Sequence, residues 1–371
     1  MSTTTGLTIP FVGLRKQYHN LRQQILDVTD EVLRSGQLMN GNYTAELEHW
    51  LAKRNRVGYA VTCHSGTQAL EIIARYCRAT ATAINPPTVL IPAMTYVATA
   101  NAFAAADWNI HFVDVDRYGV MDSRKLPELI SYQAAVLVGL YGAAVTHWAR
   151  PSTWSSWQAS DVTVIEDAAQ HWLADDCVRI GKAAAVSFDP TKNLSASGNG
   201  GAVLTNDPQL ANFARSWRDN GRSDHHHTPA SNSRMSELEC AHVLVKTQHL
   251  DAWQLRRRKI AQFWRERLKD SPVRCLIDDT NVHDHALQKF VVECDNRDQL
   301  QTQLQQRKIE TRVHYQQPLH ELAGWFSQYC GPGLMSSASA LSRRVLSLPF
   351  YPELTDLEVE YIMDQVLDLV A

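Results

Sequence analysis

The chain has 371 residues, which is too long for one small core and suits two domains, or one large domain with a smaller appendage. Its 44% hydrophobic content, 20% charged content and formal net charge of -3 give no general attraction to nucleic acid or to an anionic membrane surface. Seven cysteines without a C-x-x-C pair, and a start without an apolar run behind a basic head, predict a reduced, cytoplasmic protein with no disulfide framework, structural metal site or secretory signal.

Short β-type runs alternate with helical stretches over residues 57–205. This alternation is typical of an α/β domain in which helices flank a mostly parallel central sheet. Helices are expected over residues 66–78 and 95–106, and the second is rich in alanine, the best helix former. The predicted strands are 57–62, 89–92, 110–113, 135–139, 162–165, 184–188 and 202–205.

The pattern changes in the last third of the chain. Residues 236–268 predict one long helix or two joined helices that link the large domain to the C-terminal part of the chain. Beyond them we expect strands over 287–293 and 310–313, and helices over 297–307 and 354–367, which suits a small α+β unit. The predicted division is a large domain over residues 1–245 and a small C-terminal domain over residues 246–371.

The first segment of chemical interest comes after the first predicted strand. Residues 63–70 read CHSGTQAL, so small residues stand where a strand leads directly into a helix. Ligands of open α/β sheets bind outside the carboxyl ends of the strands, and a helix start favours an anion. A phosphate would fit here, although Ser and Thr at such a junction also make an ordinary helix cap.

The second segment is a strand that ends in two carboxylates. Residues 164–170 read VIEDAAQ, in which Glu166 and Asp167 come after two apolar residues. Such a pair can cap the next helix or bind a metal. One of the two carboxylates can also keep the ring nitrogen of a cofactor protonated.

The third segment contains a lysine. Residues 186–194 read VSFDPTKNL and are followed by GNGGAV over 198–203, so Lys192 stands among hydroxyl and amide groups rather than among charges. Most lysines are solvated surface groups, and Lys192 alone would not indicate a site. The turn over 198–201 is too short for a dinucleotide fingerprint and lacks the Walker lysine. It is better explained as a tight turn that lets the chain pass close to another backbone.

Together the segments resemble the DegT family of sugar-nucleotide aminotransferases, which belong to fold type I of the pyridoxal-phosphate enzymes. That family shows Ser-Gly-Thr-x-Ala-Leu, Pro-x-x-Thr-aromatic-x-Ala-Thr-Ala-Asn, Glu-Asp-Ala-Ala-Gln, and Ser-Phe-x-x-x-Lys-x-Leu before a Gly-x-Gly-Gly turn. The same motifs occur here, in the same order, at residues 65–70, 92–101, 166–170, 187–194 and 198–201. Further similarity at residues 9–11, 36–41, 232–238, 312–320 and 346–349 extends the resemblance over nearly the whole chain.

The resemblance implies that the large domain binds pyridoxal 5'-phosphate (PLP). Lys192 would hold PLP as a Schiff base, and Asp167 would pair with the pyridinium nitrogen, so that the ring can act as an electron sink. Asn232 would reach the phosphate in a partner subunit, which implies a homodimer with shared active sites. The other implied contacts are phosphate binding by Gly66, Thr67 and Ser187, ring stacking by Tyr96, a hydrogen bond of Gln170 with the ring hydroxyl, and substrate binding by Arg312, His314 and Tyr315.

The implied reaction moves an amino group from L-glutamate or L-glutamine to a keto sugar nucleotide. The freed amine of Lys192, its pKa lowered by burial, would move the proton between the donor carbon and the cofactor. A lysine rather than a histidine at this position argues against sugar dehydration, and the opening IPFVGL favours amination at sugar C3. Two alternatives stay open: an aminotransferase for a cyclitol or an amino acid, with Arg312 or Arg343 binding a carboxylate, and a PLP-binding regulator without turnover.

The chain departs from the family pattern at three places. Residues 171–173 read HWL where the family has small side chains after Gln170. Asn199 replaces the glutamate of the glycine-rich turn, and Gly139 replaces a histidine that is common before the Leu-Tyr-Gly segment. These departures leave the expected cofactor contacts intact and bear on the identity of the substrate.

Overall fold

The computed structural model describes residues 7–80, 86–128, 131–145, 157, 162–174, 177, 181–227, 229–277, 282, 284–323 and 335–370. Within these ranges a seven-stranded sheet has the order β1-β7-β6-β5-β4-β2-β3. The strands from β6 to β3 in this order are parallel, whereas β7 is antiparallel to both β6 and β1. The strands are β1 (Tyr59–Cys63), β2 (Thr88–Pro92), β3 (Asn109–Val113), β4 (Ala134–Val138), β5 (Thr163–Asp167), β6 (Ala183–Ser187) and β7 (Gly201–Thr205).

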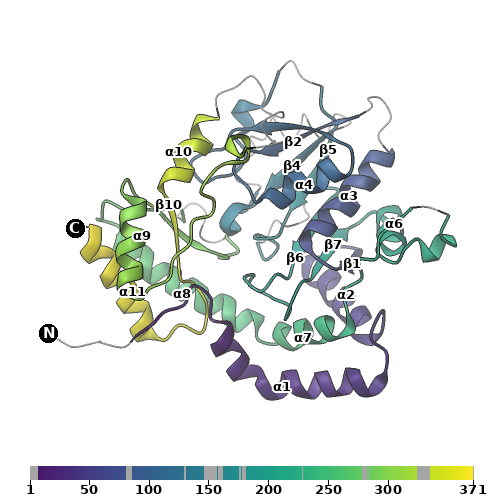
Figure 1. Ribbon diagram of the computed structural model, residues 1–371, viewed down its shortest axis with the longest axis horizontal. Coiled ribbons are helices and arrows are strands. Elements are labelled where there is room, and N and C mark those ends of the chain that lie inside the picture. The colour runs from purple at the N-terminus through teal and green to yellow at the C-terminus, as the bar shows by residue number, and fades with distance from the viewer. Residues whose placement is uncertain are drawn as a thin grey trace.

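Helices cover both faces of this sheet, which is why its strands are apolar at nearly every position. Alternate residues point to opposite faces, so Val61 and Ala185 pack with α3, α4 and α6, while Ala60 and Val186 pack with α2 and α7. The two cores fix the sheet as a rigid layer between the helices (Figure 1). The helices of this part are α1 (Leu14–Ser35), α2 (Asn42–Asn55), α3 (Gly66–Thr80), α4 (Val97–Ala105), α6 (Pro208–Arg218) and α7 (Glu237–Thr247).

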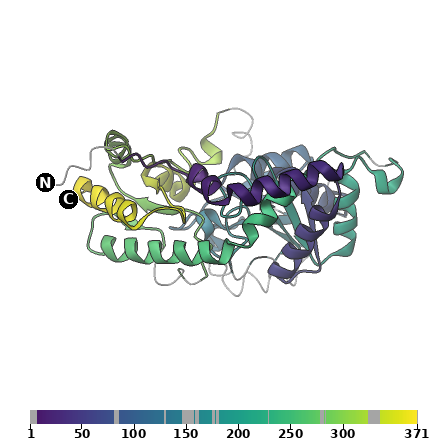
Figure 2. The same cartoon turned by 90° about the horizontal axis from the view of Figure 1, so that it is seen from below.

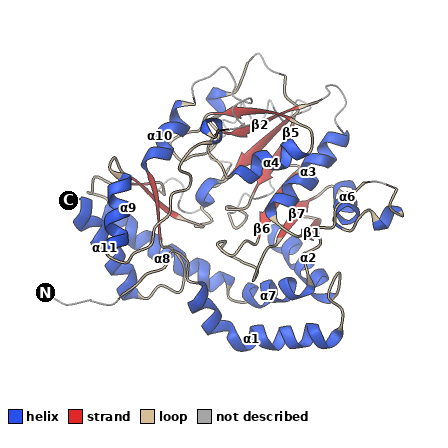
Figure 3. Ribbon diagram, in the orientation of Figure 1, coloured by secondary structure: helices blue, strands red, loops and turns tan. Residues whose placement is uncertain are grey.

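A second, smaller sheet has the antiparallel order β10-β9-β8 and lies apart from the first (Figure 3). Its core contains Trp264, Phe290 and Ile362, and Ile9 from the start of the chain joins it through a bridge to Ile309. Figure 2 shows the long helix α8 running along the edge of the molecule beneath this part. The elements are α8 (Leu250–Leu268), β8 (Arg274–Cys275), β9 (Phe290–Glu293), α9 (Arg297–Gln306), α10 (Ser336–Arg344), β10 (Val345–Leu348) and α11 (Asp356–Val370).

The predicted elements of the large sheet are all present, each within two residues of its expected limits. The stretch 236–268 forms two joined helices, α7 and α8, with Gln248 and His249 between them. The expected strand over 310–313 is wrong: only Arg312 forms an isolated bridge, with Ser347. Pairing stops there because the chain turns at His314 and Tyr315 toward the large domain. The division at residues 245 and 246 stays a prediction.

Short 3-10 helices complete the described chain, and they lie at Ser123–Lys125, Leu140–Gly142, Arg222–Asp224 and Leu319–Glu321. No helix in the described ranges is both long enough and apolar enough to cross a membrane.

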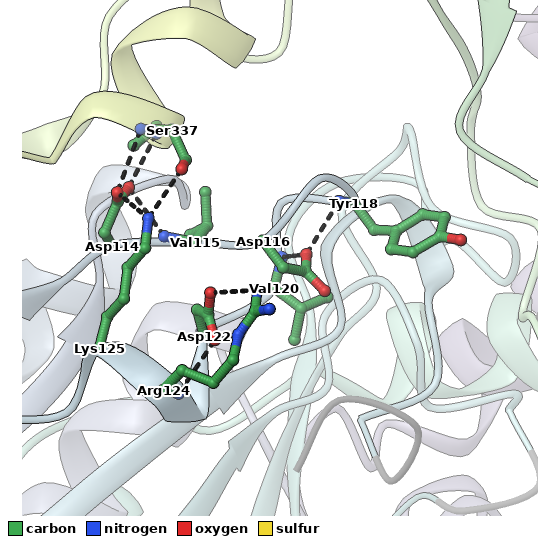
Figure 4. A network of polar contacts seen from close by, with 10 residues as sticks. Asp114, Val115, Asp116, Tyr118, Val120, Asp122, Arg124, Lys125 and Ser337 are labelled. Atoms are coloured by element: carbon green, nitrogen blue, oxygen red, sulfur yellow. Dashed lines mark hydrogen bonds and ion pairs between the residues drawn. The ribbon is translucent and has the colours of Figure 1, made fainter. Parts of the chain in front are cut away.

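A buried carboxylate at the end of β3 in the large sheet is hydrogen-bonded to the start of α10, the helix that leads into β10 of the small sheet (Figure 4). Asp114 comes directly after β3, and its oxygens accept hydrogen bonds from the backbone N–H groups of Ser337 and Ala338 at 3.1 and 2.8 Å, at the start of α10. Lys125 Nζ lies 2.6 Å from the same carboxylate. Asp114 therefore acts as the N-terminal cap of a helix that is more than two hundred residues away in sequence.

We expect Asp114→Ala to lower the free energy of unfolding by about 2–3 kcal/mol, since it removes a helix cap and the partner of Lys125. Burial opposes the charged carboxylate, but the Lys125 amine and the backbone donors outweigh it and lower the pKa of Asp114 below 3.8. The stabilisation is therefore present above pH 3.8 and is lost as the pH falls through the folded-state pKa. Urea titrations at neutral pH and below pH 3.8 measure both effects. The control is Asp364→Ala, which removes an exposed ion pair with Arg267.

Candidate active site

Most of the predicted site residues meet in a cavity of about 350 Å³ at the carboxyl ends of the parallel strands. The cavity lies between the large sheet and the segment that comes after α9. Of the predicted residues, Gly66, Thr67, Tyr96, Asp167, Gln170, Ser187, Lys192, His314 and Tyr315 line it.

Lys192 lies in the turn after β6, where its backbone N–H donates to Asp189 O at 2.9 Å. Burial lowers the pKa of its amine, and the charges of Asp167 and Asp189 oppose this shift only in part. A lowered pKa increases the fraction of neutral amine, which is the nucleophilic form. Lys192 thus has the environment that a carbonyl-reactive lysine needs.

Alternation along β5 separates the two neighbouring carboxylates. Asp167 faces the cavity, where Thr99 Oγ1 donates to its Oδ2 at 2.7 Å and the Ala169 N–H donates to its Oδ1 at 3.2 Å. Glu166 points to the opposite side, and its oxygens lie 3.3 Å from His171 Nε2 and 2.9 Å from the Gly181 nitrogen. Because successive strand residues point to opposite faces, only Asp167 can meet a cofactor in this cavity.

Two of the departures from the family pattern meet on that opposite side. His171 is fully buried, and a Cβ atom added to Gly139 would overlap its Cβ and Cγ atoms. The imidazole therefore occupies space that only a glycine at residue 139 leaves open. Glu166, His171 and Cys177 have ligand-type atoms within 4.8 Å of one another. Of the two neighbouring carboxylates, Glu166 rather than Asp167 is therefore the one that could bind a metal, the alternative that the sequence left open.

The start of α3 forms an anion cradle. Ser65 caps the helix by accepting the Gln68 N–H at 3.1 Å, while the backbone N–H groups of Gly66 and Thr67 have no hydrogen-bond partner among the described residues. Free N–H groups at a helix start bind phosphate well. Ser187 lies against Gly66, because a Cβ added there would come within 2.7 Å of Ser187 Cβ. The two interpretations of residues 63–70 are therefore compatible: Ser65 caps α3, and the N–H groups of Gly66 and Thr67 remain available to an anion.

We expect Gly66→Ala to weaken PLP binding by about 10- to 100-fold, because the new methyl group pushes Ser187 out of the cradle and costs one or two charge-assisted hydrogen bonds. The dissociation constant is obtained by titrating the apoprotein with PLP and recording absorbance. The matched control is Gly58→Ala, where the nearest atom to an added Cβ lies at 3.7 Å. Equal affinities in both variants would contradict the cradle.

The glycine-rich turn lets the backbone at Gly201 pass close to the backbone at the start of α3. Gly201 pairs with both Cys63 and Ser187, and a Cβ at this residue would lie 2.6 Å from the Gly66 nitrogen. Any side chain here would displace the start of α3. The interpretation of this turn from the sequence is confirmed.

Gln170, Tyr96 and Tyr315 lie close together in the wall of the cavity. Gln170 Oε1 accepts the Tyr141 N–H at 2.7 Å, and its Nε2 lies 3.2 Å from Tyr315 Oη. The rings of Tyr96 and Tyr315 are 5.8 Å apart and tilted by 33°. Burial, with the nearby positive charges of Lys289, Lys192 and Arg312, lowers the pKa of His314 to about 2. His314 is therefore uncharged at neutral pH.

Two predicted residues lie outside the cavity. Asn232 is exposed, and its Oδ1 accepts a hydrogen bond from Arg234 Nη2 at 3.3 Å. Arg312 is exposed too, with its guanidinium carbon 6.0 Å from the centre of the Phe11 ring. Their predicted contacts stay predictions.

Several residues in or next to the cavity that support the predicted ones were not expected from the sequence. Thr95 and Thr99 share a hydrogen bond at 2.9 Å, and Thr99 orients Asp167. Their spacing of four residues at a predicted helix start was the available signal. Asp189 and Lys289 also line the cavity. No sequence signal pointed to Lys289, because it precedes a strand of the other sheet.

The set of groups fits PLP without further residues. Lys192 offers an amine for the aldehyde, Asp167 a carboxylate for the ring nitrogen, and the start of α3 N–H donors for the phosphate. These groups stand at three strand ends of one rigid sheet, so their spacing is fixed by the fold.

Comparison with known proteins agrees with this geometry. The model of the DegT/DnrJ/EryC1/StrS aminotransferase family matches residues 19–367. A protein of Geobacillus stearothermophilus named pleiotropic regulatory protein is 32% identical over 98% of each chain. The UDP-N-acetyl-3-dehydro-alpha-D-glucosamine 3-aminotransferase of Acidithiobacillus ferrooxidans is 31% identical over 97% of each chain. The crystal structure of S. venezuelae DesV in complex with a ketimine intermediate has a TM-score of 0.89 at 29% identity, covering 98% of both chains.

The predicted fold, aminotransferase activity and PLP cofactor are confirmed. The family match spans both sheets, and similarity to the named relatives extends over the full length rather than over one motif. The chain belongs to the DegT/DnrJ/EryC1/StrS aminotransferase family.

Proposed function

We propose that the protein transfers an amino group from L-glutamate or L-glutamine to the keto carbon of a nucleotide-linked sugar. One observation carries this proposal: the Lys192 amine, the Asp167 carboxylate and the N-terminus of α3 line a single cavity. The relative from A. ferrooxidans is named for transfer to carbon 3 of a UDP-linked sugar, so a 3-keto sugar nucleotide is the first acceptor to test.

Different residues of the cavity bind the cofactor and transfer the proton. When bound, PLP withdraws electrons from the carbon that loses its proton. Asp167, which accepts a hydrogen bond from Thr99, would pair with the ring nitrogen of PLP, while Gly66, Thr67 and Ser187 would hold its phosphate.

Lys192 Nζ takes the proton from the α-carbon of the donor and returns a proton to the sugar carbon in the second half-reaction. The lowered pKa of Lys192 suits this role, because the amine must be neutral to accept a proton near neutral pH.

The working unit that we propose is a homodimer. Asn232 is exposed in the single chain, as a residue that contacts the PLP phosphate of a partner subunit would be. Tyr96 is 56% exposed although it lines the cavity, so the cavity is open on one side in a single chain. The mass of the particle in solution tests this point, and a fully active monomer would contradict it.

A second candidate function is a PLP-binding regulator without turnover. The name of the G. stearothermophilus relative favours it, since that protein is called a regulatory protein. An aminotransferase for a cyclitol or an amino acid is the other alternative. Both differ from the main proposal in the product that accumulates.

The test is a coupled assay with purified holoenzyme, L-glutamate, and UDP- or dTDP-linked 3-keto sugars. We expect mass spectrometry to detect the amino sugar nucleotide together with 2-oxoglutarate. Product only from a keto cyclitol or a keto acid would support the alternative aminotransferase. A PLP absorbance band that persists with amino donors, together with no product from any acceptor, would support the regulator.

A further inference from the structure

A second lysine reaches the cavity from the small sheet. Lys289 directly precedes β9, yet it lines the same cavity as Lys192, and it is 6% exposed. Its backbone N–H donates to Tyr141 O at 3.1 Å, and Gln288 Nε2 donates to Thr191 O at 2.9 Å. These two hydrogen bonds tie the segment to the large domain and fix where the Lys289 side chain begins.

Within the described ranges the buried amine of Lys289 makes no hydrogen bond and no ion pair, although it lines the cavity. Burial lowers the pKa of Lys289, the charges of Lys192 and Arg257 lower it further, and only Asp189 acts in the opposite sense. Burial and the nearby like charges therefore favour the neutral amine when no anion is bound. An anion that accepts a hydrogen bond from Nζ would stabilise the charged form, so the arrangement favours binding of an anion together with a proton.

The other cavity groups narrow the choice of anion. His314 is uncharged at neutral pH, because burial and nearby cations lower its pKa to about 2. Lys192 itself takes part in the reaction. Among the described residues that line the cavity, Lys289 is therefore the basic group that remains to bind an anionic group of a substrate. The PLP phosphate has its own donors at the start of α3.

The amino donor supplies an anion in the right place. Its α-carboxylate is attached to the carbon that exchanges a proton with Lys192, so this carboxylate lies close to Lys192 whenever the donor reacts. Lys289 is near enough to Lys192 for their charges to interact. In a sugar nucleotide, by contrast, the sugar ring separates the charged phosphates from the reacting carbon.

We propose that Lys289 binds the α-carboxylate of the amino donor and so determines that the first half-reaction uses amino acids. This inference rests on the proposed function, because it assumes an amino acid as donor. The residue is a specificity determinant for the donor, and the sugar half-reaction does not depend on it.

The test compares Lys289→Met and Lys289→Arg with the wild-type holoenzyme. The probe is 2-methyl-L-glutamate, which has the carboxylates of the donor but no α-proton, so that binding is measured without turnover by absorbance titration. We expect Lys289→Met to weaken binding of the probe by about 10- to 100-fold, because one charge-assisted hydrogen bond is lost. Lys289→Arg should restore most of the affinity. Lys182→Met, which removes a half-exposed lysine beside Tyr76, is the charge control.

A second probe separates carboxylate binding from general damage. The first half-reaction with 1-phenylethylamine, an amine without a carboxylate, should proceed in Lys289→Met at the wild-type rate. Unchanged affinity of Lys289→Met for 2-methyl-L-glutamate would overturn the inference. So would an equal loss for the amino sugar nucleotide, since Lys289 would then serve the acceptor. If Lys289→Met fails to fold, Lys289→Gln replaces it in both assays.

A failure of the inference about Lys289 can be distinguished from a failure of the proposed function. If the wild-type protein reacts with no amino acid, the proposed function fails, whatever the variants do. If the wild type reacts with L-glutamate and Lys289→Met binds the probe equally well, only the role of Lys289 fails.

Discussion

Replacing Lys192 by alanine is expected to abolish transamination, with a loss in kcat of at least about 10⁴-fold, because in the proposed mechanism the same amine binds PLP and moves the proton. Lys192 is the cavity lysine in the turn after β6, and burial lowers its pKa. Single-turnover absorbance changes with L-glutamate measure the loss. Borohydride reduction of the wild-type holoenzyme, followed by peptide mass spectrometry, should place the cofactor on Lys192.

The control for this variant is Lys182→Met, which keeps full activity because Lys182 lies outside the cavity. Addition of a small primary amine should restore part of the proton transfer in Lys192→Ala. A borohydride label on Lys289 or on any other residue would refute the assignment of Lys192.

Asp167→Asn should reduce kcat by about 10²- to 10³-fold, since the amide keeps the shape of the side chain but removes the carboxylate that we propose to pair with the ring nitrogen. Asp167 is 6% exposed and is oriented by Thr99. Stopped-flow measurement of both half-reactions reports the change. A fall in kcat with little change in the affinity for 2-methyl-L-glutamate is the expected signature of a charge that acts on the reacting carbon.

Thr99→Val provides a graded comparison. It removes the hydrogen bond of 2.7 Å to Asp167 but leaves the charge, so we expect a loss of about 10-fold. If Thr99→Val and Asp167→Asn lowered kcat equally, the effect would come from the geometry of β5 and not from the charge. Wild-type activity in Asp167→Asn would refute the pairing with the ring nitrogen.

The position of the site within the fold depends on sequence patterns that act locally. Apolar runs of four or five residues, each leading into small or polar residues, predicted where β1, β5 and β6 end. Parallel strands place their carboxyl ends at one edge, so Gly66, Asp167 and Lys192 were expected to meet there. The cavity contains all three.

Other features depend on contacts that no local pattern contains. The strand over 310–313 was expected from its residues, but its pairing with β10 is limited to Arg312, since the next residues turn into the cavity. Lys289 enters the cavity because the small sheet packs against the turn at Tyr141. Gly139 and His171 share one space although neither is close to the other in sequence.

The sequence by itself determined the α/β class and the order of the chemical segments, and it predicted a cofactor lysine and an acidic partner for the ring, because four ordered motifs constrain one another. Only the tertiary structure decided that Asp167 rather than Glu166 faces the cavity by geometry, that Asp114 caps α10, and that Lys289 stands unpaired beside Lys192 among the described residues. The physical reason is the range of the interactions. Strand ends, turns and helix starts depend on neighbours in the chain, whereas caps between domains and buried charges depend on which distant elements pack together.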